Sequence, residues 1–305
     1  MGALFGARFS ATGHQVVLYD TWAEHVEAIE RNGLTIEGLD GATVVRYRLE
    51  VSATPPEALQ DAELVLVMVK AYDTFDALAP LANVIQPNAF VLSLQNGLGN
   101  LEQMRAALPG HERILIGTTA HGSTVVAPGR IRHAGKGMST IGDPALPTTP
   151  RFPMTGLRNT MQKAGFDAQI AKNVYSAVWA KLVANVAINP ISALTGLRNG
   201  ELLHDPDVVT IVEQVIGETV AVMQAAGVPT TVEDHLRHVK QVMEGTHDNV
   251  SSMLQDIRRG RRTEIDAING SVVRLGDELG VPVPTNRWLA AFVRHREAEA
   301  RRSNG

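Results

Sequence analysis

Apolar and polar positions in the first 150 residues alternate between short, almost wholly apolar runs and stretches with helical spacing. The apolar runs lie at 14–19, 63–70, 89–97 and 113–120. Such runs are typical of strands that are covered on both faces, and we expect those at 63–70 and 89–97 to be fully buried central strands. This order of strand and helix predicts a mainly parallel sheet with crossover helices.

Three local patterns refine this prediction. Thr21, with Glu24 three residues later, forms a capping box for a helix that Asn32-Gly33 would end. Residues 42–51 alternate apolar and polar positions, which predicts one strand with one face exposed to solvent. Residues 123–143 contain several glycines and predict a β-meander that closes the domain.

Beyond about residue 150 the pattern becomes helical, apart from a short strand-like run at 166–170. Long helical spacings lie at 173–195, 207–226, 231–246 and 250–280. The expected fold class is therefore α/β, with an N-terminal Rossmann-like, dinucleotide-binding parallel sheet domain at 1–169 and an all-helical substrate and catalytic domain at 170–305. The charged tail from residue 294 is expected to fray.

The N-terminus matches the second part of a dinucleotide-binding motif, which runs from a strand through G-x-G-x-x-G and a helix to a second strand and an acidic residue. Gly2 would be the last glycine and Asp20 the acidic residue. The first strand and first two glycines would then lie upstream of Met1, so we expect a start codon assigned at an internal methionine, or a fragment. A helix followed by a strand and an aspartate also occurs in many other α/β proteins.

Asp20 bears on the choice of nucleotide. A carboxylate at this position accepts hydrogen bonds from a ribose 2′-hydroxyl and repels a 2′-phosphate. Neither Thr21 nor Trp22 supplies a cation, and the nearest arginine, Arg31, lies a helix away. The site therefore favours NADH over NADPH, unless Asp20 merely precedes the helix cap in a polar loop.

Composition and charge narrow the class of protein. The chain has 305 residues, 44% hydrophobic and 20% charged, so a packed core is expected. Its net charge of −4 gives no basic footprint for nucleic acid, and it has no run of about 18 apolar residues that would predict a membrane span. Cysteine is absent and the ten histidines include no H-x-x-x-H pair, so neither disulfides nor a metal site is expected. The N-terminus lacks the basic region of a signal peptide, which predicts a cytoplasmic protein.

The helical stretch at 177–194 is apolar on nearly all sides, which predicts a buried helix. Lys181, Asn185 and Asn189 interrupt it at positions i, i+4 and i+8, so they share one face. Burying these groups unpaired is costly, so this face is expected to line a polar cleft, which a kink at Pro190 would open. The alternative is that Lys181 extends to solvent and the asparagines cap neighbouring loops.

A second candidate group belongs to the helix expected at 250–280. Glu264 falls on the apolar stripe of that helix, where a carboxylate needs a partner, and Lys181 is one candidate. Ser252 lies at the start of the helix, where its hydroxyl would either cap the helix or help to bind an anion.

Two polar residues follow apolar runs in the sheet domain. Asn96, before Gly97, lies at the end of the run 89–97, and Lys70 ends the run 63–70. Open α/β sheets bind ligands at the carboxyl ends of parallel strands, so both residues are candidates for one crevice. An Asn-Gly pair is equally a good turn.

The chain resembles the ketopantoate reductase (2-dehydropantoate 2-reductase) family. The matching stretches are MGALFGARFSATGHQVVL, VKAYDT, LQNGLGN, WAKLVANVAINPISALTG, NGEL and SSMLQDIRRGRRTEIDAINGSVVRLGDELGVPVPTN. They follow the family's order over nearly the whole chain. The resemblance implies a Rossmann domain, a helical domain, and an active site in the cleft between them.

The resemblance also implies residue roles. The family's catalytic lysine falls on Lys181, and its acidic active-site residue falls on Glu264. Its substrate-binding asparagines fall on Asn185 and Asn189, and the serine that binds the substrate carboxylate falls on Ser252.

On the cofactor side, the resemblance places the asparagine near the nicotinamide at Asn96 and a lysine at Lys70. Two features depart from the family pattern. The first two glycines of the phosphate loop are absent, and many members carry an arginine near position 21, where this chain has Asp20-Thr21. Both departures concern the affinity and identity of the cofactor.

The implied reaction is reduction of 2-dehydropantoate to (R)-pantoate in pantothenate biosynthesis, with NADPH or NADH as cofactor and Asp20 favouring NADH. Two alternatives stay open. One is a related NAD-dependent 2-hydroxyacid dehydrogenase that acts on another 2-keto acid. The other is a truncated, non-catalytic nucleotide-binding paralogue. The expected partner is a small 2-keto acid, and a homodimer is the candidate assembly.

Overall fold

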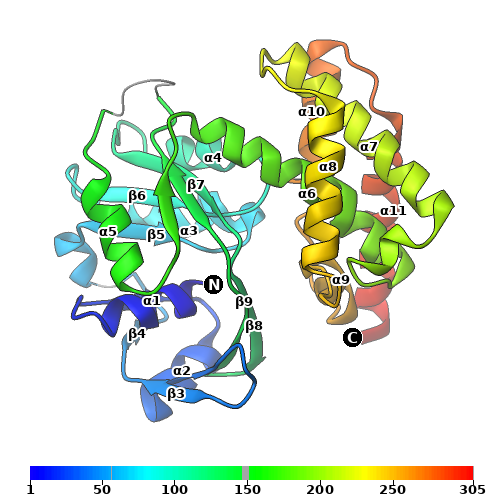
Figure 1. Ribbon diagram of the computed structural model, residues 1–305. Coiled ribbons are helices and arrows are strands. Elements are labelled where there is room, and N and C mark those ends of the chain that lie inside the picture. The colour runs from blue at the N-terminus through cyan, green and yellow to red at the C-terminus, as the bar shows by residue number, and fades with distance from the viewer. Residues whose placement is uncertain (56, 146–150, 305) are drawn as a thin grey trace. The chain divides into compact units, whose positions relative to one another are not determined.

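The computed structural model describes residues 1–55, 57–145 and 151–304 (Figure 1). The chain divides into two compact units. The sheet unit comprises Met1–Gln95 and Asn100–Ala177, and the helical unit comprises Asn96–Gly99 and Val178–Gly305. The expected limit between the functional domains, at residues 169 and 170, stays a prediction.

The sheet unit contains a five-stranded sheet built on the predicted apolar runs. In spatial order its strands are β11 (Ala168–Ile170), β10 (Ser139–Gly142), β7 (Ile114–Thr119), β6 (Phe90–Ser93) and β5 (Leu64–Val67). β5, β6 and β7 are parallel neighbours, while β10 runs antiparallel to β7 and parallel to β11. β6 and β7 are mostly buried, as strands covered on both faces should be. The α/β fold class and the strand at 166–170 are confirmed.

Two smaller sheets complete this unit. One pairs β1 (Val17–Tyr19) with β4 (Glu50–Ser52), and the other has the order β3 (Val44–Tyr47), β2 (Leu34–Glu37), β9 (Arg130–Gly135), β8 (Gly122–Ala127). The single strand predicted at 42–51 is wrong, because β3 pairs with β2 whereas β4 pairs with β1. The predicted β-meander is wrong in part, because β8 and β9 form a hairpin while β10 pairs in the five-stranded sheet.

β5 is less buried than its apolar run predicts. Three of its four residues are half-buried. It pairs with β6 on one side, and no other strand in the described ranges pairs with its second side. The prediction of a fully covered central strand is therefore wrong for β5. The expectation of a further strand and two glycines upstream of Met1 stays a prediction.

The α-helices of the sheet unit are α1 (Gly2–Ser10), α2 (Ala23–Asn32), α3 (Thr74–Leu78), α4 (Asn100–Ala107) and α5 (Thr155–Lys163). Short 3₁₀ turns lie at Glu57–Asp61, Ala71–Asp73 and Ala79–Leu81. In α1, Leu4 and Phe5 are completely buried, and the Phe5 ring stacks on Phe166 with centroids 4.0 Å apart. This packing fixes α1 to the core of the unit.

The start of α2 differs from its predicted capping box. The N-cap residue is Trp22, and no side chain caps the helix. Instead, the Asp20 carboxylate accepts the Trp22 N–H at 2.9 Å, one step before the helix begins. The capping box is therefore wrong, because the N-cap position is one residue after Thr21. The predicted stop is confirmed, since α2 ends at Asn32 and Gly33 takes a φ of 74°.

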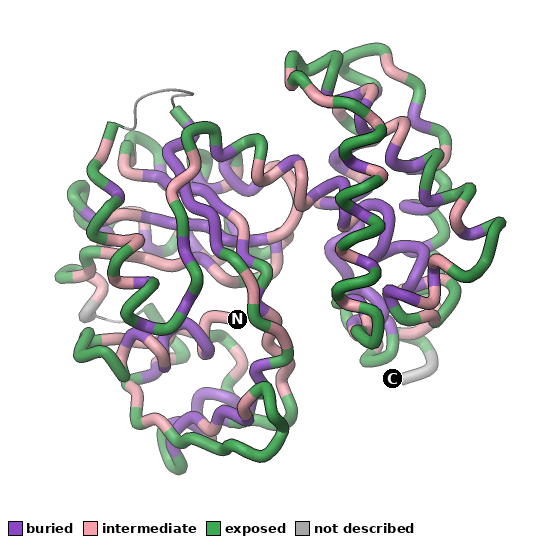
Figure 2. The backbone as a smooth tube through the Cα atoms, in the orientation of Figure 1, coloured by how far each residue is buried: buried purple, intermediate pink, exposed green. Residues whose placement is uncertain are grey.

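The helical unit contains six α-helices in the described residues: α6 (Val174–Thr195), whose first turn is counted with the sheet unit, α7 (Pro206–Ala225), α8 (Val232–Gly245), α9 (Ser252–Arg258), α10 (Asn269–Leu279) and α11 (Pro284–Asn304). A 3₁₀ turn lies at Glu201–Leu203. The helices predicted at 173–195, 207–226 and 231–246 are confirmed. Figure 2 shows the buried residues concentrated along α6, which supplies much of the core of this unit.

Two predictions for the helical unit are wrong. The helix expected at 250–280 is two helices, because α9 ends at Arg258, Gly260 takes a φ of 62°, and the chain stays non-helical until Asn269. The tail expected to fray from residue 294 continues as part of α11 to Asn304. Both corrections concern the surroundings of Glu264.

α6 and α7 are long and apolar enough to cross a membrane by length and composition alone. In α6, 67% of the apolar window is buried within the protein, and in α7 the share is 44%. A core helix passes the same test, and the packing of α6 in the core of its unit accounts for its apolar sequence.

Candidate active site

α6 presents the three polar residues that interrupt its apolar sequence. Lys181, Asn185 and Asn189 lie four residues apart along one continuous helix, so they share a face. Asn189 is buried, and Lys181 and Asn185 are half-buried. Pro190 does not end the helix, which runs on to Thr195.

Lys181 is subject to two opposing electrostatic effects. Burial of its ammonium group lowers its pKa from the usual 10.5 to about 8, and the charge of Glu264 acts to raise it. The ammonium form therefore dominates at neutral pH, while the pKa is low enough for ready proton transfer. A lysine in this environment is suited to act as a general acid.

Glu264 lies near Lys181, as predicted, but not on a helix. It belongs to the non-helical segment between α9 and α10 and is 7% exposed. The side-chain amide of Asn96 donates to its Oε2 atom at 3.1 Å. The structure therefore brings Lys181, Glu264 and Asn96 together within the helical unit.

The segment Asn96–Gly99 packs against the loop that carries Glu264. The Leu98 N–H donates to the Ala267 carbonyl at 2.9 Å. Gly97 has a φ of 82°, and a Cβ atom there would lie 2.3 Å from the Ala267 carbonyl oxygen. Glycine is thus required both for the backbone conformation and for the close approach, which fixes the position from which Asn96 reaches Glu264.

Asn185 has a buried amide nitrogen without a partner. Its Nδ2 atom is closed to solvent and makes no hydrogen bond in the described part of the chain. Leaving such a donor unpaired costs about 1–3 kcal/mol. Because Asn185 shares the face of Lys181, this nitrogen is a candidate donor to a bound molecule.

Ser252 begins α9, but the residue that caps this helix is Ser251. The Ser251 hydroxyl is buried and accepts the Leu254 N–H at 3.1 Å. Ser252 is exposed. The interpretation of Ser252 as a plain helix cap is therefore wrong, and its hydroxyl is accessible to a ligand.

Three residues expected to bind the cofactor lie in the sheet unit. Gly2 opens α1, Asp20 follows β1, and Lys70 follows β5 at the start of a 3₁₀ turn. The charges of Asp20 and Lys70 both act at the position of the Met1 nitrogen, which directly precedes α1. The structure therefore gathers Gly2, Asp20 and Lys70 around the N-terminal end of α1.

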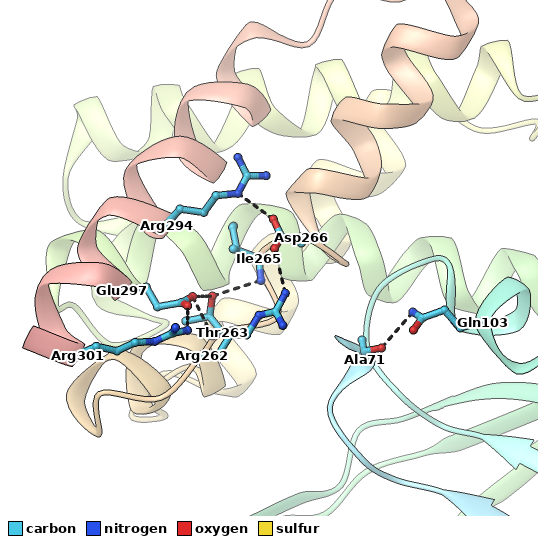
Figure 3. Close-up of polar contacts among 9 residues, drawn as sticks. All are labelled: Ala71, Gln103, Arg262, Thr263, Ile265, Asp266, Arg294, Glu297 and Arg301. Carbon is cyan, nitrogen blue, oxygen red and sulfur yellow. Dashed lines mark hydrogen bonds and ion pairs between the residues drawn. The ribbon is translucent and has the colours of Figure 1, made fainter. Parts of the chain in front are cut away.

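The loop that carries Lys70 is held by two glutamines that no sequence pattern singled out. Gln95 Nε2 donates to the Val69 carbonyl at 2.7 Å. Gln103 Nε2 donates to the Ala71 carbonyl at 3.0 Å (Figure 3). Gln95 lies in the stretch LQNGLGN, which could have pointed to it, whereas Gln103 lies on an ordinary helical face.

The chemistry of these residues fits a dinucleotide. Asp20 is exposed, and the Trp22 N–H holds one oxygen of its carboxylate, which suits it to accept hydrogen bonds from ribose hydroxyls. Lys70 provides a cation close to the N-terminal end of a helix, where phosphate groups are favoured.

Comparison with known proteins points to one family. The family described as "Ketopantoate reductase PanE/ApbA" matches this chain over residues 1–145. The family described as "Ketopantoate reductase PanE/ApbA C terminal" matches it over residues 173–297. The 2-dehydropantoate 2-reductase of Halobacterium salinarum is 35% identical over 294 residues, covering 96% of this chain and 95% of that protein. The enzyme of the same name from Pyrococcus horikoshii is 32% identical over 298 residues, covering 98% and 95%.

Solved structures show the same similarity. A PanE/ApbA family ketopantoate reductase from Ralstonia eutropha JMP134 superimposes with a TM-score of 0.87 at 34% identity, covering 98% of this chain and 97% of that one. The ternary structure of D-mandelate dehydrogenase with NADH and anilino(oxo)acetate gives a TM-score of 0.87 at 25% identity, covering 97% and 95%.

The fold, Lys181 with its lowered pKa and these matches define the class of the protein as an NAD(P)-dependent oxidoreductase. Within that class, the chain belongs to the ketopantoate reductase family. The family resemblance read from the sequence is confirmed.

Proposed function

We propose that this protein reduces the 2-keto group of 2-dehydropantoate to give (R)-pantoate, a step of pantothenate biosynthesis, with NADPH or NADH as the cofactor. The observation that supports this most directly is Lys181, whose pKa is lowered to about 8 by burial beside the carboxylate of Glu264. The relatives named 2-dehydropantoate 2-reductase, between 30% and 35% identical over nearly the whole chain, support the choice of substrate.

In this proposal Lys181 is the general acid. A nicotinamide cofactor, when bound, would supply the hydride that adds to the carbonyl carbon of the substrate. The Lys181 ammonium donates a hydrogen bond to the keto oxygen and transfers a proton to it from Nζ as negative charge develops there, leaving a neutral amine. A pKa near 8 keeps the group charged at neutral pH and makes it a better proton donor than an exposed lysine.

Other residues of the helical unit would hold the substrate. Glu264 would accept a hydrogen bond from the terminal hydroxyl of 2-dehydropantoate, and the exposed Ser252 hydroxyl would donate to its carboxylate. Asn185 and Asn189 would orient the ammonium group and the substrate. The unpartnered Nδ2 atom of Asn185 supports this role, because a ligand would satisfy it.

The nucleotide would be held by Gly2, Asp20 and Lys70, with Asn96 near the nicotinamide. We propose that NADH binds more tightly than NADPH. The exposed Asp20 carboxylate suits the 2′-hydroxyl of NADH and repels the extra phosphate of NADPH. Lys70 supports the binding of the pyrophosphate common to both.

A second function is favoured by Asp20 and by the similarity to a D-mandelate dehydrogenase solved with NADH. This is the NAD-dependent reduction of another 2-keto acid. The same Lys181 chemistry would serve it, since the keto group and carboxylate are common to both substrates. The substituent on the keto carbon distinguishes the two functions.

The test is reduction of 2-dehydropantoate, phenylglyoxylate and pyruvate, each with NADPH and NADH, by the wild-type chain and Lys181→Ala. We expect the highest kcat/KM with 2-dehydropantoate. Lys181→Ala should lower kcat by about 10²–10³-fold, as loss of one group that stabilises a developing oxyanion typically does. Lys240→Ala, which changes an exposed lysine of α8, should behave as the wild type.

Three outcomes separate the hypotheses. Near-normal turnover by Lys181→Ala would show that the proton donor is another group. A higher kcat/KM with phenylglyoxylate or pyruvate would favour the second function. Binding of NADH or NADPH in isothermal titration, together with no turnover of any of the three substrates, would favour the non-catalytic nucleotide-binding paralogue.

A further inference from the structure

The carboxylate of Glu264 is carried by a segment with no regular secondary structure of its own. Residues 261–268 lie between α9 and α10 and include no helix or strand. The backbone contacts within this stretch include the Ala267 and Ile268 N–H groups donating to the Glu264 carbonyl. Such a segment needs anchors on neighbouring elements to hold one side chain in a fixed place.

One such anchor is Glu297 on α11 (Figure 3). Its Oε2 atom accepts the Thr263 N–H at 3.0 Å and the Thr263 hydroxyl at 2.9 Å. The Thr263 hydroxyl in turn accepts the Ile265 N–H at 3.3 Å. The residues on either side of Glu264 are thus tied, directly or through one hydroxyl, to a single carboxylate oxygen.

The hydrogen bonds between Thr263 and Glu297 lie where solvent screens them little. Thr263 is 1% exposed, and the Glu297 side chain is 12% exposed. Arg301, one turn further along α11, donates to the other oxygen of Glu297 and balances its charge. Hydrogen bonds to a charged group in a partly buried position are worth more than exposed ones.

A second interaction between this segment and α11, made by Asp266, is weaker. Arg294 donates to Asp266 at 2.8 Å, and Arg262 pairs with the same carboxylate at 3.7 Å. All three side chains are about half exposed, so solvent screens both pairs. Of the two ties between the segment and α11, the one through Glu297 is therefore the stronger.

Two interactions of the Glu264 carboxylate depend on where it lies, one with Asn96 and one with Lys181. Asn96 donates to its carboxylate at 3.1 Å, and its charge acts on Lys181. Both interactions weaken as the carboxylate moves away, since the Coulomb energy falls with distance and a hydrogen bond requires close contact.

We propose that Glu297 is a positioning residue, which acts through Thr263 to hold the Glu264 carboxylate beside Lys181 and Asn96. This inference rests on the proposed function, in which Glu264 and Lys181 work together. It assigns part of the catalytic geometry to the last helix of the chain.

The proposal differs from a purely structural role for Glu297 in one measurable quantity. If the anchor merely joins α11 to the unit, its loss lowers stability but leaves the electrostatics of the site unchanged. If it positions Glu264, its loss lowers the pKa of Lys181, because the carboxylate that acts to raise that pKa moves away.

The test compares Glu297→Ala, Thr263→Val and Thr263→Ser with Glu264→Gln. The pKa of Lys181 is measured by NMR in protein labelled with ¹³C-lysine, and kcat/KM is measured against pH. We expect Glu297→Ala to lower the pKa of Lys181 in the direction of Glu264→Gln, to move the alkaline limb of the profile to lower pH, and to reduce kcat/KM about tenfold. Thr263→Val should do the same to a smaller degree.

Two variants serve as controls. Thr263→Ser keeps the hydroxyl and should retain the wild-type pKa. Glu299→Gln changes a more exposed carboxylate on the same helix, which pairs with His295 and Arg296, and should also retain it. Should Glu297→Ala not fold, Thr263→Val carries the comparison, because it removes one hydroxyl and keeps the shape of the side chain.

The outcomes separate this inference from the proposed function. If Glu264→Gln changes the pKa of Lys181 and lowers kcat/KM while Glu297→Ala and Thr263→Val leave both at wild-type values, the positioning role is wrong and the proposed function stands. If Glu264→Gln leaves kcat/KM unchanged, the role of Glu264 in the proposed function is itself wrong.

Discussion

Gly97 leaves no room for a side chain between segment Asn96–Gly99 and the loop of Glu264. We expect Gly97→Ala to destabilise the protein by about 2–4 kcal/mol, because the new Cβ atom would meet the Ala267 carbonyl at 2.3 Å in a backbone conformation that already disfavours side chains. Because Asn96 would shift with the backbone, kcat/KM should fall as well. Urea unfolding and steady-state kinetics would measure the two effects.

The matched control for this prediction is Gly227→Ala. Gly227 has a φ of 79°, close to that of Gly97, but a Cβ atom there would meet nothing within 4 Å. Its substitution should cost only the penalty of the left-handed backbone, about 1–2 kcal/mol, and leave kcat/KM unchanged. Equal effects of the two substitutions would contradict a special role for the contact with Ala267.

Among single residues, those on a regular helix were the easiest to place from the sequence. Lys181, Asn185 and Asn189 share a face because the helical repeat fixes it, and α6 is one unbroken helix. The sequence also predicts that Glu264 is buried, which is confirmed, but it places Glu264 on a helix, whereas the residue lies in a non-helical segment. Ser252 shows the limit of this reasoning, because which of two adjacent serines caps a helix depends on a one-residue shift in where the helix starts.

The N-terminal end of α11 depends on a carboxylate from another element. Glu218, on α7, accepts the backbone N–H groups of Thr285 at 2.7 Å and Asn286 at 2.9 Å, and the Asn286 side-chain amide at 2.9 Å. The two backbone N–H groups are donors that the start of an isolated helix leaves unsatisfied. We expect Glu218→Ala to lower the free energy of unfolding by about 2–3 kcal/mol, because it leaves buried donors without an acceptor.

Glu218→Gln should cost less, since it keeps one acceptor oxygen. Glu213→Ala, at an exposed position of the same helix, should change stability by less than about 0.5 kcal/mol. Denaturant unfolding of the three variants at one pH would measure these differences. A similar loss in Glu213→Ala and Glu218→Ala would show that removal of any glutamate side chain from α7, rather than loss of the contact with α11, accounts for the effect.

For helices and strands, the sequence predicts which kind of element forms better than where that element begins and ends. The apolar runs and helical spacings locate most strands and helices. They predict one helix at 250–280 where the structure has α9 and α10, and they predict no helix at the position of α11. A charged stretch such as 294–304 looks like a solvated tail until its partner is known. Glu297 accepts hydrogen bonds from Thr263, 34 residues earlier, and no local pattern links the two.

The assignment of segments to the two units was the least predictable feature of the whole molecule. The order of strands and helices anticipated a sheet domain followed by a helical one. It could not show that Asn96–Gly99, within the sheet half of the sequence, clusters with the helical unit. That assignment follows from contacts such as Asn96 with Glu264, which are 168 residues apart.

The response of the whole molecule to acid should reflect its buried histidines. His121 and His133, both buried, contact each other through Nδ1 and Nε2 at 3.2 Å, and the His121 ring packs edge-on against Phe5 and Phe166. These rings join α1, the β8–β9 hairpin and the segment before β11. Burial, with a smaller effect of His133, lowers the pKa of His121 to about 4.

A buried histidine with a lowered pKa makes the folded protein less stable as the pH falls. Above about pH 6.5 the ring is neutral in both the folded and the unfolded chain, and its full contribution is present. As the pH falls from 6.5 towards 4, the unfolded chain takes up a proton that the folded chain does not, so the free energy of unfolding decreases.

We therefore expect the wild-type protein to lose on the order of 1–2 kcal/mol through His121 between pH 6.5 and pH 4.5, after allowance for solvent screening. His121→Phe keeps an aromatic ring in the cluster and should flatten this part of the curve. His204→Gln, at an exposed position, should leave the slope as it is in the wild type. Urea unfolding at half-unit pH steps would measure the slopes, and an unchanged slope in His121→Phe would show that other groups control acid stability.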